Sequence, residues 1–348
     1  MSDSAAAPPG DAAPQVTVVV VPRERFSVSV RSLTRLMGCT GTPFELVYVD
    51  GGSPAYVRDR LQEEAARYGF RIVRTERYLS PNQARNLGLQ HVTTPYVVFL
   101  DNDVIVTPGW LDPLVQCAEE TGAWVVGPLN FEGDLEDLEI HNAGGFLTFD
   151  GPPGQQDLLQ DNRYGHQPLS ALPEGLERLE VDYVELHCAL VRRSAFDVIG
   201  PLDEGLLSTR EHLDLCLQVT RAGGSVWSEL TSRVTYDHPP PVTPSDLPFF
   251  VLRWSEAWND ASVRHFIAKY GLSEDYLVRK GGPRARRSVL FGPATRLAER
   301  AGGKRAADLV SKVLVGGERY LNAGLVGPRA RRLASRPPLV ETAAGHDH

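Results

Sequence analysis

The chain has 348 residues, of which 42% are hydrophobic, enough to bury one large core or two modest ones. Its net charge of −8 argues against a nucleic-acid partner, because an acidic surface repels phosphate. No run approaches the roughly 20 apolar residues of a membrane-spanning helix, and four cysteines without CxxC spacing predict buried thiols in the cytoplasm rather than disulfides or a zinc site.

Strands and helices are expected to alternate in the first third of the chain, after a disordered lead-in at residues 1–14 that lacks the pattern of a signal peptide. Short β-branched or apolar runs predict strands at residues 16–21, 44–49, 70–74 and 96–100. Apolar residues at helical spacing predict helices at residues 26–37, 57–68 and 83–90. This alternation predicts the α/β class, with a mostly parallel sheet that helices cover on both faces.

The pattern is less regular in the second half of the chain. Residues 131–173 are rich in Gly, Asp, Pro and Asn and are expected to form a long loop with short hairpins. Further strands are expected at residues 124–127, 188–191 and 225–236, and helices at 211–221 and 248–270. The region after Gly271 predicts short amphipathic helices separated by Gly-Gly pairs.

Asp101, Asn102 and Asp103 directly follow the most hydrophobic predicted strand. Carboxylates two residues apart project to the same side, and ligands of parallel sheets bind outside the carboxyl ends of the strands. Mg²⁺ and Mn²⁺ prefer oxygen ligands and often bridge protein carboxylates to substrate phosphates. The triplet therefore predicts a divalent metal held by Asp101 and Asp103, although Asp and Asn also favour turns after strands.

Asp50-Gly51-Gly52-Ser53 follows an earlier strand in the same way. Glycine lets the backbone approach a ligand closely, and a carboxylate can accept a hydrogen bond from a base or a ribose. A turn in which Ser53 caps the next helix fits the same residues. Both interpretations stay open at this point.

Four segments occur in order along the chain: Thr17-Val-Val-Val-Val-Pro22, Val47-Tyr-Val-Asp-Gly-Gly-Ser53, Asn82-Gln-Ala-Arg-Asn-Leu-Gly88 and Phe99-Leu-Asp-Asn-Asp103. Together they resemble the signatures of glycosyltransferase family 2. The resemblance implies the GT-A fold, a Rossmann-like sheet with a nucleotide-binding half followed by an acceptor-binding half. It also implies a nucleotide-sugar donor, UDP- or GDP-linked, and Mn²⁺ or Mg²⁺ as cofactor. The residues that it places at the donor are Pro22, Asp50, Ser53, Arg85, Asn86, Asp101 and Asn102.

The segments Ile199-Gly-Pro-Leu-Asp-Glu204 and Arg210-Glu-His-Leu-Asp-Leu215 resemble a later region of the same family. In most members an acidic pair there supplies the general base for the acceptor hydroxyl, and here His212 replaces the second acid of that pair. Glu211 and His212 can each accept a proton at neutral pH, so both are candidate bases. A base on the opposite face of the sugar from the leaving group predicts inversion of the anomeric centre, as is usual in the family.

Three further sites carry aromatic or imidazole side chains. His238 ends a predicted strand before three prolines, and a late histidine completes the metal site in several GT-A enzymes; we expect it to be a metal ligand, with a surface-loop histidine as the alternative. His187 fits an acceptor site and a packed strand equally. Trp254 and Trp258 lie four residues apart on one helical face, where core packing is favoured over a platform for a sugar.

The basic residues are concentrated near the end of the chain. From Arg279 to Arg336 there are 15 Lys or Arg and three acidic residues, a balance of +12. Such a tail can meet an anionic membrane, another polyanion or an acidic partner, or form solvated helix faces. We expect a cytoplasmic protein with peripheral attachment to anionic membrane as one role of this tail. The expected organisation is a lead-in at 1–14, a nucleotide-sugar-binding half at 15–130, an acceptor-binding half at 131–245, an aromatic helical segment at 246–278 and a basic helical tail at 279–348.

Two other functions are compatible with parts of this pattern. The histidine at position 212 keeps open a non-catalytic scaffold that binds a sugar nucleotide or a glycan. A nucleotidylyltransferase would carry a glycine-rich stretch near the first strand, where Arg23 and Arg25 are present but the glycines are not. The favoured function is transfer of a sugar from a nucleotide diphosphate donor to an acceptor hydroxyl.

Overall fold

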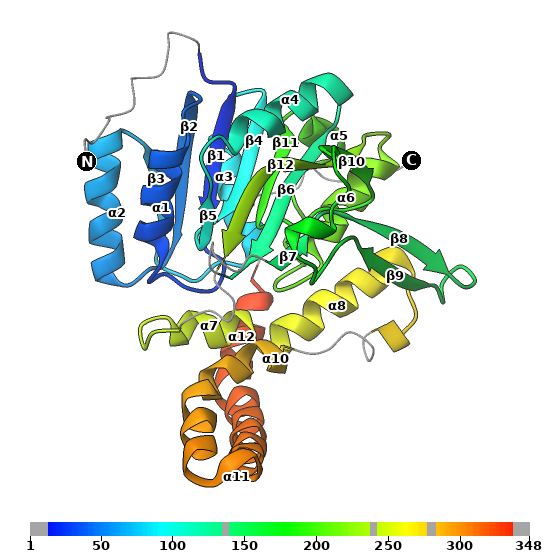
Figure 1. Ribbon diagram of the computed structural model, residues 1–348. Coiled ribbons are helices and arrows are strands. Elements are labelled where there is room, and N and C mark those ends of the chain that lie inside the picture. Colours follow the sequence, from blue (N-terminus) through cyan, green and yellow to red (C-terminus); the bar gives the residue numbers. More distant parts are fainter. Residues whose placement is uncertain (1–12, 134–138, 237–241, 277–282, 337–348) are drawn as a thin grey trace.

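The computed structural model describes residues 13–133, 139–236, 242–276 and 283–336 (Figure 1). Within them, a ten-stranded sheet has the order β10-β12-β6-β11-β4-β1-β2-β3, with β5 paired to β12 and β7 to β6. Its strands are β1 Val16–Val21, β2 Phe44–Gly51, β3 Arg71–Thr75, β4 Tyr96–Asp101, β5 Val104–Val106, β6 Val125–Glu132, β7 Glu139–Asn142, β10 Arg178–Val181, β11 Cys188–Arg192 and β12 Val226–Tyr236. Strands β3, β2, β1 and β4 are mutually parallel, whereas β11 runs antiparallel to β4 and to β6.

Helices cover both faces of this sheet (Figure 1). They are α1 Ser29–Cys39, α2 Ala55–Tyr68, α3 Pro81–Leu89, α4 Leu111–Thr121, α5 Ala195–Ile199 and α6 Glu211–Arg221. Alternate residues of β1 enter different cores: Val18 and Val20 pack with residues of α1 and α4, and Val19 and Val21 with residues of α3 and α6. A strand buried on both faces reads as a continuous apolar run. The predicted α/β class with a mostly parallel sheet is therefore confirmed.

Helix α3 lies directly on β1 because Gly88 has no side chain. A Cβ at this position would lie 2.2 Å from Cγ1 of Val19, which is closer than two carbon atoms can approach. The close packing holds the polar residues of α3 at the carboxyl edge of the sheet. It is the local reason why Arg85 reaches the end of β4.

Most predicted helices have somewhat different bounds in the structure, and for two of them a contact explains the difference. The helix expected at 26–37 begins at Ser29, because the backbone N–H groups of Phe26 and Ser27 donate to the Asp246 carboxylate at 2.9 and 3.0 Å. The helix expected at 248–270 is divided into α7 Leu247–Arg253 and α8 Glu256–Tyr270. The division occurs because Ser255 adopts an extended conformation and its hydroxyl caps α8. The expected hairpin in the glycine-rich loop is present as β8 Gly145–Asp150 and β9 Asp157–Asn162.

The end of the described chain is helical, as predicted. Its helices are α10 Arg284–Arg287, η2 Ser288–Phe291, α11 Gly292–Leu321, η3 Asn322–Val326 and α12 Gly327–Ala334. Helix α11 folds back at Gly303, whose φ is 72°, so that it forms a hairpin that projects from the body (Figure 1). The Gly302-Gly303 pair thus separates two helices, but the Gly316-Gly317 pair lies inside one. None of the helices within the described ranges is long and apolar enough to span a bilayer.

Candidate active site

The predicted site residues gather at the carboxyl edge of the parallel strands. A pocket opens there, and its wall includes Asp101 at the end of β4, Arg85 on α3, and Glu211 and His212 at the start of α6. These residues are up to 127 positions apart in sequence, from Arg85 to His212. The fold therefore brings two of the predicted donor residues, Arg85 and Asp101, and both candidate bases to one pocket.

Asp101 is buried and holds three cationic or imidazole groups. Its Oδ1 accepts from Nη2 of Arg85 at 3.2 Å, and its Oδ2 lies 3.0 Å from Nδ1 of His187 and 3.6 Å from Nε of Arg23. Burial raises the pKa of Asp101 to about 7, against the lowering effect of the charges on Arg85 and Arg23. Its carboxylate is thus only partly compensated by the protein.

Asp103 is equally buried, but its carboxylate makes no hydrogen bond among the residues that the structure describes. Nη1 of Arg23 and Nη2 of Arg25 lie 3.6 Å away, which is an ion-pair distance but beyond a hydrogen bond. Burial raises the pKa of Asp103, and the two arginine charges oppose that effect. A buried carboxylate that makes ion pairs but no hydrogen bond within the described residues is suited to a cation supplied from outside the chain.

The acids of this edge fit a divalent metal shared with a substrate. Within the described residues no cluster of three or more Asp, Glu, His or Cys surrounds one point, and Asp101 and Asp103 are the acids of this edge that could hold such an ion. Mg²⁺ and similar ions are commonly bound by one or two carboxylates, with substrate phosphates and water as the remaining ligands. His238, the third predicted ligand, lies outside the described residues.

Asn102 has a role that the sequence did not indicate. Its amide donates to the carbonyl oxygen of Arg25 at 2.7 Å and to Oγ of Ser29 at 2.9 Å, and its Oδ1 accepts from the backbone N–H of Arg23 at 3.0 Å. All these bonds fix the turn after β1. Asn102 therefore orients Arg23 and Arg25 toward the two acids, and its predicted contact with nucleotide stays a prediction.

Asp50 and Ser53 form a small buried network at the end of β2. The Asp50 carboxylate accepts from both N and Oγ of Ser53 at 2.9 Å and forms an ion pair with Arg74. Pro54, not Ser53, precedes the first turn of α2, and no side chain caps that helix; the interpretation of Ser53 as a helix cap is wrong. Arg74 is the register partner of Asp50 on β3, a pairing that strand register alone would have indicated.

The Ala-Arg-Asn segment of α3 divides into two roles. Arg85 donates to Asp101 and to the carbonyl oxygen of Leu186 at 3.1 Å and lines the pocket. The Asn86 amide instead donates to the carbonyl oxygen of Leu202 at 2.8 Å and accepts from its N–H at 2.9 Å. Asn86 thus binds the loop that precedes α6. Pro22, also predicted at the donor, is buried where β1 ends.

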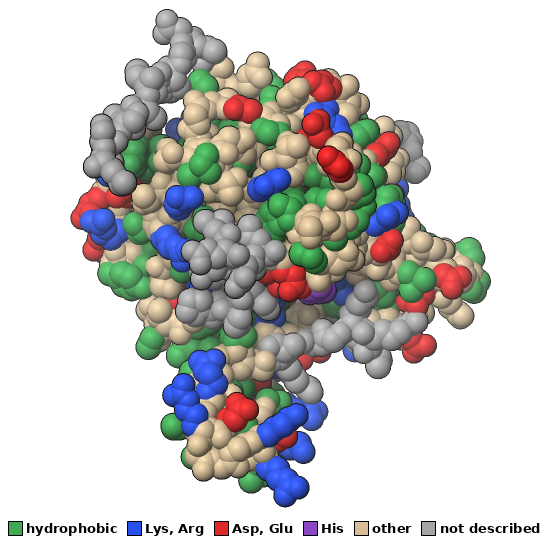
Figure 2. Space-filling model, viewed as in Figure 1, with side chains coloured by type: hydrophobic (Ala, Val, Ile, Leu, Met, Phe, Trp, Pro, Cys, Tyr) green, Lys and Arg blue, Asp and Glu red, His purple; other side chains and the backbone are tan. Residues whose placement is uncertain are grey.

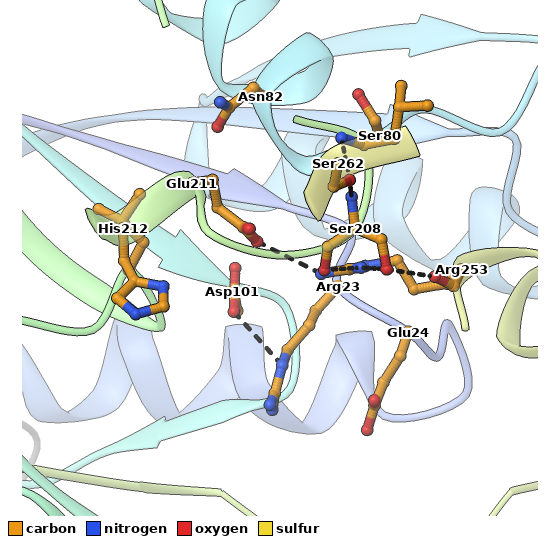
Figure 3. A network of polar contacts seen from close by, with 12 residues as sticks. Arg23, Glu24, Ser80, Asn82, Asp101, Ser208, Glu211, His212, Arg253 and Ser262 are labelled. Carbon is orange, nitrogen blue, oxygen red and sulfur yellow. Dashed lines mark hydrogen bonds and ion pairs between the residues drawn. The ribbon is translucent and has the colours of Figure 1, made fainter. Parts of the chain in front are cut away.

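Glu211 and His212 begin α6 at the pocket wall. Arg210 before them has a φ of 74°, unusual for a residue with a side chain and typical of functional sites. Oε1 of Glu211 lies 3.4 Å from Nη2 of Arg253, and Oε2 has no hydrogen-bond partner among the described residues. Burial would raise the pKa of Glu211, but the charges of Arg253 and Arg85 outweigh it and lower the pKa below its ordinary value. Figure 3 shows the side chains of Glu211 and Asp101 directed toward the same space.

His212 and His187 both line the pocket. Nε2 of His212 is 3.6 Å from Oε1 of Glu185, and its ring centroid is 5.9 Å from that of Tyr183. His187 contacts Asp101 and lines the pocket, so it is more than a packed strand residue, and its predicted place at the acceptor stays a prediction. Burial lowers the pKa of His187 well below its ordinary value, which keeps its ring neutral.

Several arginines of the pocket were not identified as site residues from the sequence. Arg23 pairs with both acids of the triplet and lies 4.5 Å from the centroid of the Tyr236 ring. Arg253 is held by Ser208, whose Oγ is 2.8 Å from its Nη1 (Figure 3). A charged residue directly after the buried strand and Pro22 was the available signal for Arg23. Arg253 carried no such signal, because α7 meets the site only through contacts between segments distant in the sequence.

Trp254 and Trp258 lie in different surroundings. Trp258 is 1% exposed and packs with Leu207, Leu252 and Ala330, which agrees with the predicted core position. Trp254 instead lines the pocket, and its indole N–H donates to Glu24 at 2.7 Å. The helix break at Ser255 separates the two side chains.

The loop before α6 is attached to α8 through Asp203. Oδ2 of Asp203 lies 2.9 Å from Nε2 of His265 and 2.8 Å from Nζ of Lys269, which also contacts Asp214 on α6 at 2.7 Å. Burial would raise the pKa of Asp203, but the bonds from His265 and Lys269 outweigh it and lower the pKa, and the same bond raises the pKa of His265. These contacts hold the amino end of α6 in place.

Asp203→Asn should lower the free energy of unfolding by about 1 kcal/mol at pH 5.5 and by less at pH 8.5. The contribution of Asp203 is complete above its unfolded pKa of about 3.9 and is lost as the pH falls through its folded value. The contribution of His265 is complete below its unfolded pKa of about 6.5 and is lost as the pH rises through its folded value. Urea unfolding at pH 3, 5.5 and 8.5 measures both. His265→Asn should abolish the difference between the two higher pH values; an unchanged difference would contradict the assignment.

Known glycosyltransferases are similar to this chain in sequence. A family model described as Glycosyl transferase family 2 matches residues 20–200. A pre-mycofactocin glycosyltransferase of Mycobacterium tuberculosis is 27% identical over 232 residues, which are 66% of this chain and 44% of that protein. Polypeptide N-acetylgalactosaminyltransferase 15 of Mus musculus is 26% identical over 245 residues, 66% of this chain and 38% of that protein. The chain thus spans less than half the length of these relatives.

A solved structure has the same general fold. The crystal structure of GalNAc-T7 with UDP, GalNAc and Mn²⁺ superposes with a TM-score of 0.52 at 19% sequence identity. The superposition covers 75% of this chain and 51% of that chain. At this identity the likeness concerns the fold, and it agrees with the GT-A architecture expected from the sequence.

Proposed function

The chain belongs to glycosyltransferase family 2, and we therefore propose that it moves a sugar from a UDP- or GDP-linked donor to the hydroxyl group of an acceptor. The observation that best supports this proposal is the meeting of Asp101 and Glu211 in one pocket. Asp101 belongs to residues 15–130, which we propose bind the nucleotide sugar. Glu211 belongs to residues 131–245, which we propose bind the acceptor.

We propose that Glu211 is the general base. Its Oε2 has no hydrogen-bond partner among the described residues, and its lowered pKa keeps the carboxylate ionised at neutral pH. It takes the proton of the acceptor hydroxyl as that oxygen forms a bond to the anomeric carbon. The bond from this carbon to the phosphate oxygen breaks, and its electron pair leaves with the nucleoside diphosphate. Attack from the face opposite the leaving group inverts the anomeric centre.

The arginines of the pocket can stabilise the leaving group. Arg23 and Arg85 lie beside Asp101, where fixed positive charges can offset the charge that develops on a departing diphosphate. Asp101 and Asp103 are the residues proposed to hold Mn²⁺ or Mg²⁺, which when bound supplies Lewis-acid stabilisation of the same charge. The partial compensation of these two acids supports this proposal.

The test is a screen of UDP- and GDP-sugars by thermal unfolding with Mn²⁺, followed by measurement of nucleoside diphosphate release. A donor at 100 times its Kd stabilises the folded state by about 2.7 kcal/mol, which should raise Tm by about 5 °C or more. Binding followed by release of diphosphate supports a transferase. Binding without release in the presence of varied acceptors would favour the scaffold function, and no stabilisation by any nucleotide would contradict the proposal.

We also propose that the projecting hairpin attaches the enzyme to an anionic membrane. On α11, Leu309, Val313 and Tyr320 are 64%, 65% and 78% exposed and share one face at helical spacing. The exposed cations Lys312 and Arg319 lie next to this face, seven residues apart. Figure 2 shows lysine and arginine side chains over the surface of the projecting hairpin. An exposed apolar row flanked by basic residues is typical of helices that lie in a lipid interface.

Full-length protein should float with anionic liposomes at low salt and lose binding at high salt, because a basic residue near an anionic surface contributes about 1 kcal/mol that salt screens. The double variant Lys312→Glu with Arg319→Glu should lose flotation. Arg60→Glu with Arg67→Glu is the matched control, since these exposed cations are also seven residues apart on a helix of the body. Equal flotation of both double variants would contradict the assignment, as would binding to neutral liposomes alone.

A further inference from the structure

The region after residue 279 is more than an attached tail, because one of its side chains enters the pocket. Arg286, on the short helix α10, lines the pocket together with Arg23, Arg253 and Asp101. Its guanidinium carbon lies 5.3 Å from the centroid of the Trp254 ring, within the range of a cation–π contact. The C-terminal region thus contributes a cation to a site whose other residues come from the body of the fold.

Arg287 holds Arg286 in that position. It is 0% exposed, and its Nη2 lies 3.0 Å from Oε1 of Glu256 on α8. Its Nε and Nη2 donate to the two carboxylate oxygens of Glu318 on α11 at 2.5 and 3.0 Å. A planar guanidinium that binds a carboxylate through two bonds fixes geometry as well as charge. The hairpin, α10 and α8 are therefore joined at the residue next to Arg286.

Further contacts join the same region to the body. The indole N–H of Trp258 donates to the carbonyl oxygen of Ala330 on α12 at 3.0 Å, and Oδ1 of Asn322 accepts from the backbone N–H of Glu256 at 3.3 Å. Ala330 is itself 0% exposed. The C-terminal helices thus contact α8 through Arg287, Asn322 and Ala330, so removing them would take Arg286 from the pocket.

The wall of the pocket carries more positively than negatively charged side chains. Its wall contains five arginines (Arg23, Arg85, Arg210, Arg253 and Arg286) and three carboxylates (Asp101, Glu185 and Glu211). Arg23, one of these arginines, lies 3.6 Å from both Asp101 and Asp103. The excess of positive charge therefore lies beside the acids proposed to hold the metal, where the phosphates of the donor would bind.

We propose that Arg286 binds the diphosphate of the donor, so that the C-terminal helices complete the donor site. This inference rests on the proposed function for the identity of the donor. A diphosphate oxygen and a guanidinium form a charge-assisted bond, which contributes more than a neutral hydrogen bond. The C-terminal region then has two roles, one in the pocket through Arg286 and one at the surface of the hairpin.

The experiment is calorimetric titration of the full-length protein and its variants with UDP, GDP, the matching monophosphates and nucleosides, and inorganic pyrophosphate. Arg286→Ala should weaken the tighter nucleoside diphosphate and pyrophosphate on the order of 10- to 100-fold. It should weaken the monophosphate less and leave the nucleoside unchanged. Arg286→Lys keeps the charge but not the planar fork and should recover part of the loss. Arg296→Ala, an exposed arginine of the hairpin, is the matched control and should bind as the unmodified protein does.

Each outcome decides for or against the inference. Diphosphate binding by Arg286→Ala equal to that of the unmodified protein would overturn it, and so would equal weakening of nucleoside and diphosphate, which indicates general damage to the pocket. If the unmodified protein binds pyrophosphate through Arg286 but no nucleotide, the assignment of Arg286 to a diphosphate stands, and the proposed function, with the donor it names, fails. If turnover of a nucleotide sugar is intact in Arg286→Ala, the proposed function stands and the inference fails. Absence of any phosphate binding by the unmodified protein would overturn both.

Discussion

Glu211→Gln should lower kcat by about 10²- to 10⁴-fold while nucleotide affinity stays within about twofold, the effect expected from loss of a general base. Glutamine has nearly the same shape and keeps the contact of Oε1 with Arg253, so the pocket should retain its form. What it loses is the ability of Oε2 to take a proton. Steady-state kinetics with a saturating donor gives kcat, and calorimetry with the nucleoside diphosphate gives affinity.

His212→Asn distinguishes the two candidate bases. Its imidazole is 3.6 Å from Glu185 and lines the same pocket, so a role in proton transfer would appear as a loss comparable to that of Glu211→Gln. We expect a much smaller loss, because Oε2 of Glu211, at the first turn of α6, has no hydrogen-bond partner within the part of the chain that the structure describes. The reverse ranking would assign the base to His212, and two mild effects would remove both residues from that role.

Removal of divalent metal should lower kcat on the order of 10³-fold, since Lewis-acid stabilisation of a departing diphosphate contributes several kcal/mol. The motivation is the pair Asp101 and Asp103, two buried carboxylates whose pKa values burial raises. Activity is measured with Mn²⁺, with Mg²⁺ and with EDTA in excess. Equal turnover in EDTA and in Mn²⁺ would contradict metal dependence directly.

Asp103→Asn connects that effect to this site. The amide keeps the volume of the side chain but removes the charge that a metal requires, so nucleoside diphosphate affinity should no longer differ between Mn²⁺ and EDTA. Removing one charge beside Arg23 and Arg25 also destabilises the fold. An independent measurement therefore uses the unmodified protein. The electron-spin signal of free Mn²⁺, recorded with and without nucleotide, gives the amount of Mn²⁺ that the protein binds. Asp260→Asn, an exposed acid on α8, is the control and should retain the metal effect.

Local pattern was sufficient for much of the fold. The strand predicted at 16–21 has those bounds as β1, and the helix predicted at 211–221 has those bounds as α6. Both depend on apolar residues spaced at the period of one element, which is information that neighbouring residues carry. The position of Asp101 at a strand end follows for the same reason. The family could also be inferred from the sequence, since each of its four signatures is a short continuous segment.

Side-chain partners could not be inferred in this way. Arg23, Arg74 and Arg253 each contact a predicted site acid, but these pairs are separated by 78, 24 and 42 residues, and only Arg74 is related to its partner by strand register. Asn86 and Asn102 were predicted at the donor, and in the structure their amides hydrogen-bond to backbone and side-chain groups of the protein, which the sequence did not indicate. A polar side chain has the same local signature whether it binds a ligand or satisfies a buried backbone group.

The sequence by itself determined the class of fold, the family and the edge at which the acids lie, because periodicity and strand-end position are local properties. The tertiary structure alone decided which charges meet. Arg286 lies 185 residues after Asp101 and joins the same pocket only because Arg287 and α12 pack the C-terminal helices on α8. Composition alone does not distinguish the basic residues of this tail. In the structure Arg286 lines the pocket, Arg287 is buried, and other basic residues are exposed on the hairpin. Burial and pairing of charges depend on contacts between distant segments, and no local pattern encodes them.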